Sequence, residues 1–147
     1  MKKVLYQFCE DYILGRLQRI KVNIEEINTS LNSETKSSAG DKHETGRAMV
    51  QLEREKLGRQ LLEAEKTFLL LQRAKNSKPS TKVSLGSLVK TSNSTYYIAI
   101  SAGKLVINSK ETYCISPNTP IGKLLFGKSE DDVFIFNNKE FKILKIS

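Results

Sequence analysis

The sequence predicts an α+β protein in which an antiparallel helical hairpin precedes a small domain of strands with one short helix. Two observations lead to this fold class. Before residue 77 there is no proline, and apolar residues recur mostly at steps of three and four. After it come all three prolines and most of the β-branched and aromatic runs. We therefore place the hairpin at residues 1–76, a linker at 77–81 and the second domain at 82–147.

The apolar pattern of the first half predicts two long helices that pack as a coiled coil. In the first helix the expected buried stripe is Leu5, Phe8, Tyr12, Leu17, Ile20, Ile24, Ile27 and Leu31. In the second helix it is Val50, Leu57, Leu61, Ala64, Phe68 and Leu71, whose steps match a coiled-coil seam. The polar residues 33–41 predict a turn, with the hairpin tip at about 36–46. We expect a monomer; a dimer in which the seam pairs between chains is the alternative.

The second half contains five strand-like runs and one short helix. The runs rich in β-branched and aromatic residues cover 83–89, 95–100, 113–115, 133–136 and 141–146. Thr119 is placed to cap a short helix that begins at Pro120, and Gly127 is placed to end it. Such a module, at under about 70 residues, is close to the lower size limit for independent folding.

The composition excludes several classes of protein. Of 147 residues, 39% are hydrophobic and 27% are charged, which is normal for a folded soluble protein. No run approaches the roughly 18 apolar residues of a membrane span, so we expect no membrane association. Cys9 and Cys114 fall in different predicted domains and offer neither a disulfide framework nor a metal-binding spacing. We therefore expect a reducing, cytoplasmic location.

The formal net charge is +8, from 24 Lys plus Arg against 16 Asp plus Glu. This balance favours an anionic partner, either nucleic acid or an acidic protein surface. The charges along both helices are mixed in sign, which is more typical of a solvated face than of a nucleic-acid-binding stripe, so we expect any DNA binding to be weak. The chain has no glycine-rich nucleotide loop, one histidine and no GxSxG motif, so an independent enzyme is not expected.

The residues at the predicted hairpin tip have two interpretations. Asp41 followed by Glu44 has the spacing of an N-cap with its capping box at the start of the second helix. Alternatively, the two carboxylates are ligands for Mg²⁺, which prefers carboxylate oxygen and water. His43 adds a weak transition-metal pattern, for which a solvated turn histidine is the simpler interpretation. Lys42 and Arg47 either solvate the turn or contact phosphate.

Several stretches form one ordered set of motifs. Residues 83–89 read VSLGSLV, residues 115–128 read ISPNTPIGKLLFGK, and Asp132 precedes Val133. After a hairpin that carries Gly40, Asp41 and Glu44 at its tip, this set resembles the Gre family of bacterial transcript-cleavage and elongation factors over nearly the whole chain. The matching family patterns are Gly-Ser-x-Val, I-S-x-x-S-P-x-G-x-A-L-x-G-K and Gly-Asp-x-Val. The tip departs from the family: positions 43, 45, 47 and 48 hold His, Thr, Arg and Ala where the family has Ser, Asn, Glu and Tyr.

The resemblance implies that the second domain is FKBP-like and that the protein binds RNA polymerase. The hairpin would enter the polymerase secondary channel and meet the nascent RNA 3′ end only indirectly. Asp41 and Glu44 would help to hold a Mg²⁺ ion shared with the polymerase, whose own nuclease activity then cleaves backtracked RNA. The protein would have no catalytic centre of its own. Its partner contacts would come from Lys42, His43 and Arg47 at the tip and from Ser116, Pro117 and Pro120 at the channel rim.

Two other functions stay open on the sequence. Arg47, in place of an acidic residue, suits a secondary-channel regulator that occludes or tunes the polymerase without cleavage. The FKBP-like half suggests a prolyl isomerase or chaperone, whose active site is a pocket lined by aromatic residues. The spacing of the strand aromatics favours packing in a core instead; these residues are Tyr96, Tyr97, Tyr113, Phe126, Phe134, Phe136 and Phe141.

Overall fold

In the computed structural model, the described backbone covers residues 1–36 and 41–147, and the described side chains cover residues 1–32 and 46–147. The contacts within the chain divide it into two compact units. One unit contains Met1–Tyr12 and Thr67–Ser147, and the other contains Ile13–Lys66. Each unit therefore includes part of both long helices.

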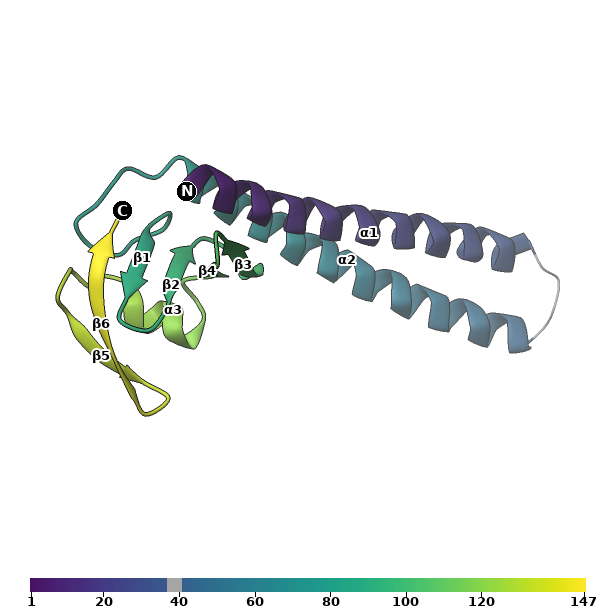
Figure 1. Cartoon of the computed structure of the whole chain (residues 1–147). Coiled ribbons are helices and arrows are strands. Elements are labelled where there is room, and N and C mark those ends of the chain that lie inside the picture. The colour runs from purple at the N-terminus through teal and green to yellow at the C-terminus, as the bar shows by residue number, and fades with distance from the viewer. Residues whose placement is uncertain (37–40) are drawn as a thin grey trace. The chain divides into compact units, whose positions relative to one another are not determined.

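Two helices of 35 residues each form the first half: α1 spans Lys2–Lys36 and α2 spans Asp41–Lys75. They lie side by side and run in opposite directions (Figure 1). The unit Ile13–Lys66 contains only segments of these two helices and the residues between them, so its buried side chains are covered by helix-on-helix packing. The predicted helical first half is confirmed. Within the described residues, no helix combines the length and the apolar character needed to cross a bilayer.

The buried face of α1 differs in part from the predicted one. Its buried side chains are Leu5, Cys9, Ile13, Leu17, Ile20 and Ile24. Leu17, Ile20 and Ile24 were predicted to be buried and are buried. Tyr12 was also predicted to be buried, but it is 41% exposed. The four-residue steps from Leu5 to Leu17 pass through Cys9 and Ile13, so these two residues share the buried face. The prediction passed over Cys9, although a free cysteine packs as a small hydrophobic residue.

The buried face of α2 follows the prediction closely. Its fully buried side chains are Leu57, Ala64, Leu71 and Ala74, and its half-buried ones include Val50, Leu61 and Phe68. These positions recur at steps of three, four and seven, which keep them on one face of the helix. Exposed apolar residues lie on the other faces, among them Met49, Leu52 and Leu62.

The second half forms a six-stranded mixed sheet. The strands are β1 (Leu88–Thr91), β2 (Thr95–Ile98), β3 (Gly103–Ile107), β4 (Lys110–Ile115), β5 (Val133–Phe136) and β6 (Lys139–Ile146). Their order is β3-β4-β2-β1-β6-β5, in which β2 and β4 are parallel and all other neighbours are antiparallel. Strand β1 therefore lies between β2, which follows it closely in the chain, and β6, which is the last strand. The predicted α+β class is confirmed.

One predicted strand begins later than expected, and one strand was not predicted. The run at 83–89 becomes a strand only from Leu88, because Gly86 adopts φ +89° and its N–H donates to the Ile98 carbonyl at 2.7 Å. Strand β3 was not predicted at all. It joins β4 through Asn108 and Ser109, whose φ values of +50° and +65° make a tight hairpin turn without the glycine that usually marks one.

The core of the sheet is covered by helix α3, which spans Pro120–Leu125. Leu125 is fully buried in a cluster with Val83, which precedes β1, and with the strand residues Val89, Tyr96, Ile98, Phe134, Phe141 and Ile143. The predicted cap is confirmed: the Thr119 hydroxyl accepts a hydrogen bond from the Gly122 N–H at 3.1 Å, and Pro120 is the first helical residue. Gly127 follows the helix with φ +85°, a conformation that glycine adopts without strain.

Candidate functional site

The predicted tip residues Asp41, Lys42, His43 and Glu44 have side chains outside the described residues. Their backbone belongs to α2, which begins at Asp41. Arg47 is described and is partly buried. Among the side chains that are described, no group of three or more His, Cys, Asp and Glu residues could hold a metal ion.

The predicted partner residues of the second half form a tightly built turn before α3. The Ser116 carbonyl accepts hydrogen bonds from the Thr119 N–H at 3.2 Å and from the Thr119 hydroxyl at 2.7 Å. Gly122 packs against this turn so closely that an added Cβ would collide with the Ser116 carbonyl oxygen. Pro117 is partly buried and Pro120 is exposed. The turn is therefore held in one conformation and presents Pro120 to solvent.

Two exposed apolar residues extend this surface. Leu124, which was not predicted as a site residue, is 37% exposed. Phe126 was predicted to pack in a core, but it follows the end of α3 and is 49% exposed. Leu124 lies four positions after Pro120 in the same helix, so the two residues share a face. We call Pro120, Leu124 and Phe126 the α3 surface.

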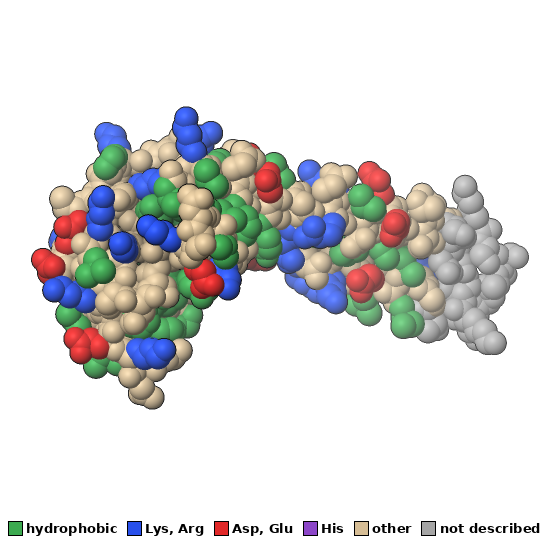
Figure 2. All heavy atoms as spheres, in the orientation of Figure 1, with side chains coloured by type: hydrophobic (Ala, Val, Ile, Leu, Met, Phe, Trp, Pro, Cys, Tyr) green, Lys and Arg blue, Asp and Glu red, His purple; other side chains and the backbone are tan. Residues whose placement is uncertain are grey.

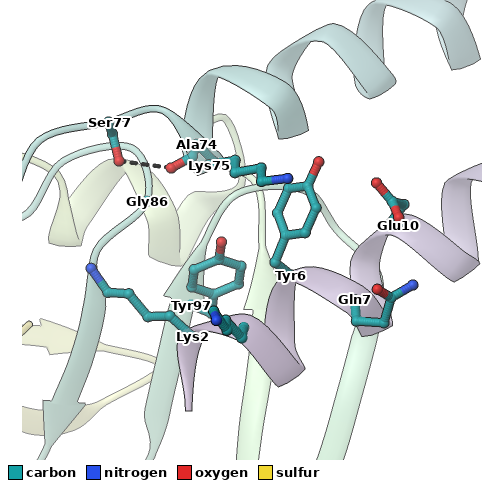
Figure 3. A pocket seen from close by; sticks show the side chains of 10 residues that line it. Lys2, Tyr6, Gln7, Glu10, Ala74, Lys75, Ser77, Gly86 and Tyr97 are labelled. Atoms are coloured by element: carbon teal, nitrogen blue, oxygen red, sulfur yellow. Dashed lines mark hydrogen bonds between the residues drawn. The ribbon is translucent and has the colours of Figure 1, made fainter.

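A cavity of about 520 Å³ lies within the unit formed by Met1–Tyr12 and Thr67–Ser147 (Figure 3). Its walls come from the first turns of α1, the end of α2, the loop before β1, and β2. The residues that give the cavity its chemistry are Lys2, Lys3, Tyr6, Glu10, Lys75 and Tyr97. None of them was predicted as a site residue, because they meet only through the packing of α1 and α2 on the sheet.

The cavity gathers more positive than negative charge. Within the described part of the chain, no carboxylate oxygen lies within 4.0 Å of the ammonium nitrogen of Lys2, Lys3 or Lys75. Burial lowers the pKa of Lys2, because desolvation disfavours its charged form. The Lys75 ammonium lies 5.1 Å from the centroid of the Tyr6 ring, which is cation–π geometry.

The Glu10 carboxylate lies next to the phenol of Tyr6. Burial raises the pKa of Tyr6, and the negative charge of Glu10 raises it further. Figure 3 shows these two side chains on neighbouring turns of α1, with the Lys75 chain reaching toward the ring from α2. The cavity wall thus holds one glutamate and three lysines, and none of these lysines forms an ion pair with a described carboxylate.

Tyr97 is the most deeply buried polar side chain in the cavity wall. It is only 2% exposed, and burial raises its pKa to about 12, so the hydroxyl is protonated at neutral pH. No hydrogen bond joins this hydroxyl to any described residue. In Figure 3 the hydroxyl points away from the strand, into the space between Lys2, Tyr6 and Ser77.

The loop that closes one side of the cavity is fixed by a close approach. The Ser77 hydroxyl donates to the Ala74 carbonyl at 2.7 Å, at the end of α2. Gly86 lies directly against both groups, and an added Cβ would collide with the Ser77 oxygen and the Ala74 carbonyl oxygen. The wall is therefore built around a glycine for which no other residue has room.

The two cysteines lie far apart in the sequence but belong to the same compact unit. Cys9 is fully buried and Cys114 is 2% exposed, and both are free thiols. The hydrogen bond between the two side chains, together with burial, raises the pKa of Cys9. The first turns of α1 belong to the same unit as the sheet, so a helix residue and a strand residue far apart in the sequence become neighbours.

Comparison of the chain with known protein families, with curated proteins and with solved structures finds no match. The functional assignment below therefore depends on the residues of this chain and on the arrangement of its helices and sheet.

Proposed function

We propose that this protein is a Gre-type transcription factor that binds RNA polymerase and stimulates Mg²⁺-dependent cleavage of backtracked RNA. In this proposal the turn between α1 and α2 enters the secondary channel, and the protein acts as a monomer in the cytoplasm. The main support is the pair of 35-residue helices, each about 50 Å long at 1.5 Å per residue, with Asp41 as the first residue of α2.

The unit Ile13–Lys66 is suited to insertion into a partner because it has little core of its own. Its buried side chains lie along one seam, which we propose is a coiled coil. Apolar side chains remain exposed on its other faces, with Met49 67% exposed and Leu52 65% exposed. Figure 2 shows hydrophobic side chains between charges of both signs along the helix pair. A channel with a mixed apolar and charged lining would cover such a surface.

The donor set at the tip suits Mg²⁺. Asp41 and Glu44 are three positions apart in a helix, a spacing that puts two residues on one face. Magnesium is commonly held by one or two carboxylates and keeps several waters, so a second protein can complete its coordination. The ion would activate a water and stabilise the leaving oxygen of the phosphodiester. The role of this chain is to carry the two carboxylates to the polymerase metal.

The second half would hold the protein at the rim of the channel. We propose that its six-stranded mixed sheet with α3 is an FKBP-like domain and that Ser116, Pro117 and the α3 surface contact the polymerase. The support is the fixed turn at Ser116 and the exposure of Leu124 and Phe126 next to it. An exposed apolar patch beside a rigid turn is typical of a protein contact site.

RNA cleavage in a stalled, backtracked elongation complex tests this proposal. We expect the protein to release short 3′ fragments in the presence of Mg²⁺, and the Asp41→Asn and Glu44→Gln variants to lose this activity while still binding the polymerase. Glu55→Gln is the matched control, because Glu55 is an exposed acid on the same helix, away from the tip. Polymerase binding with no cleavage, and no difference between Asp41→Asn and wild type, would favour the occluding regulator instead. Absence of binding would reject both.

The prolyl isomerase alternative gains little support from the fold. Tyr96, Phe134 and Phe141 are packed in the core of the sheet, as their spacing predicted. Phe134 and Phe141 stack on one another, with ring centroids 5.1 Å apart. These rings are therefore used for packing. A prolyl-peptide assay with no rate above background would exclude this activity.

A further inference from the structure

We propose that the cavity lined by Lys2, Lys3, Lys75 and Tyr97 binds a small phosphate-bearing ligand of nucleotide size. This site is separate from the hairpin tip and the α3 surface, and it does not depend on polymerase binding.

The first argument is charge. Three ammonium groups line the cavity without an acidic partner in the described part of the chain, and Lys2 is partly desolvated. Glu10 is the one carboxylate among the residues that line the cavity, so the three lysines outnumber it. A cluster of cations in a hollow attracts an anion, because the low-dielectric walls strengthen each interaction.

The second argument is hydrogen bonding. Ammonium groups only donate, and the hydroxyl of Tyr97 has a proton to donate at neutral pH. Several donors that line one cavity favour a ligand with several acceptor oxygens, and a phosphate group has that chemistry.

Tyr97 gives the third argument. The Tyr97 side chain is 2% exposed, and no hydrogen bond joins its hydroxyl to a described residue. No buried side-chain oxygen in the described part of the chain lacks a partner, so the hydroxyl oxygen itself is accessible from the cavity (Figure 3). The hydroxyl is therefore available to donate to a ligand oxygen in place of a water.

The volume of the cavity and its lining residues favour a larger organic anion over a single phosphate ion. A volume of about 520 Å³ is within the usual range for small-molecule sites and is far larger than one phosphate ion needs. Tyr6, Ala74 and the ring of Tyr97 supply apolar wall beside the lysines. A ligand with an organic part and a phosphate part, such as a nucleoside diphosphate, matches this combination better than inorganic phosphate does.

Calorimetric titration of the full chain with ADP, in low salt and without polymerase, tests the proposal. We expect saturable binding to one site, with inorganic phosphate binding at least about tenfold more weakly because it leaves the apolar wall uncovered. Tyr97→Phe should weaken ADP binding by about two- to tenfold, the usual effect of one lost hydrogen bond. The double variant Lys2→Gln, Lys75→Gln should weaken it by more than about tenfold.

Lys139→Gln with Lys110→Gln is the matched control, since both lysines are exposed on strands outside the cavity and the change in net charge is the same. This control should bind ADP as the wild type does. Equal weakening in the two double variants, or no saturable ADP binding by the wild type, would overturn the proposal. Circular dichroism and the urea midpoint of each variant identify any loss of binding that is caused by unfolding.

Because polymerase is absent from this titration, its result is independent of the cleavage assay. A chain that binds ADP without stimulating cleavage would keep the cavity assignment and lose the Gre-type function. A chain that stimulates cleavage and binds no ADP would keep the Gre-type function and lose the cavity assignment.

Discussion

The thiol of Cys9 in α1 contacts the thiol of Cys114 in β4, and both residues are buried. This pair joins the start of the helical half to the centre of the β2, β3 and β4 part of the sheet, where Cys114 pairs with Tyr97 on one side and Gly103 on the other. Each thiol packs there as a small hydrophobic side chain.

We predict that both cysteines react slowly with a thiol-reactive disulfide reagent in the native state. The thiolate is the reactive form, and the raised pKa of Cys9 leaves little of it there. The interaction with Cys9 lowers the pKa of Cys114, so the slow reaction of Cys114 depends on its burial, at 2% exposed. The Ser30→Cys variant places a third thiol on an exposed position of α1, and this thiol should react at least about tenfold faster under the same conditions. The two native thiols should become reactive only in denaturant. Equal rates for the native cysteines and for the introduced thiol would show that the pair is accessible.

Gly86→Ala should destabilise the protein strongly. At φ +89° an alanine is strained, and its Cβ would also collide with the Ala74 carbonyl oxygen. We expect a loss of more than about 2 kcal/mol in the free energy of unfolding, measured by urea denaturation. Gly103→Ala is the matched control, because Gly103 has φ +100° but nothing within 4 Å of the added Cβ. It should lose only about 1 kcal/mol, from backbone strain alone. A similar loss at both positions would mean that the close approach at Gly86 relaxes.

Leu57→Ala should weaken the helix pair. Leu57 is 6% exposed on the buried face of α2, so the change leaves a cavity between the helices. The expected loss is about 2–4 kcal/mol, followed by the helical circular dichroism signal during urea denaturation. Leu62→Ala on the same helix removes a side chain that is 53% exposed and should stay within about 0.5 kcal/mol of wild type. If the two variants unfolded alike, the assignment of the buried face would be wrong.

The stability of the protein should fall at alkaline pH through Tyr97. Burial raises the pKa of this phenol from 10.0 to about 12, so the folded state keeps the proton longer than the unfolded state does. The stabilisation is complete below pH 10 and is lost as the pH rises from about 10 toward 12. Absorbance titration of the tyrosinates should show one phenol that ionises last, and Tyr97→Phe should remove it. Ionisation of all phenols near pH 10 in the folded protein would contradict this.

Local signals in the sequence were sufficient for some elements and insufficient for others. Helix α3 could be predicted from Thr119, Pro120 and Gly127, because a cap, a first-turn proline and a terminating glycine act within one or two turns. Strand β3 was missed because its turn at Asn108 and Ser109 lacks glycine and its residues are mostly exposed. The signals that predict α3 lie within or next to its own residues, whereas β3 has no comparable local signal.

The cavity could not be predicted in the same way. Lys2, Lys75 and Tyr97 come from a helix start, a helix end and a strand, and each alone is an ordinary residue of its element. They meet only because the start of α1 and the end of α2 pack in the same unit as the sheet. The hairpin tip is the opposite case, since its candidate ligands are near neighbours in the sequence and could be proposed from spacing alone.

The position of β1 between β2 and β6 determines when the sheet can form during synthesis. Residues of β1 pair with the neighbouring β2, but their second edge pairs with β6, which is made last of all the strands. A nascent chain that has emerged only as far as β5 can pair β3, β4, β2 and β1, but it lacks the strand that joins β5 to them. The helix segments within Ile13–Lys66 need no such delay, because this unit contains no part of the sheet. On the ribosome, these segments can therefore pair early, while β5 joins the sheet only after β6 leaves the exit tunnel.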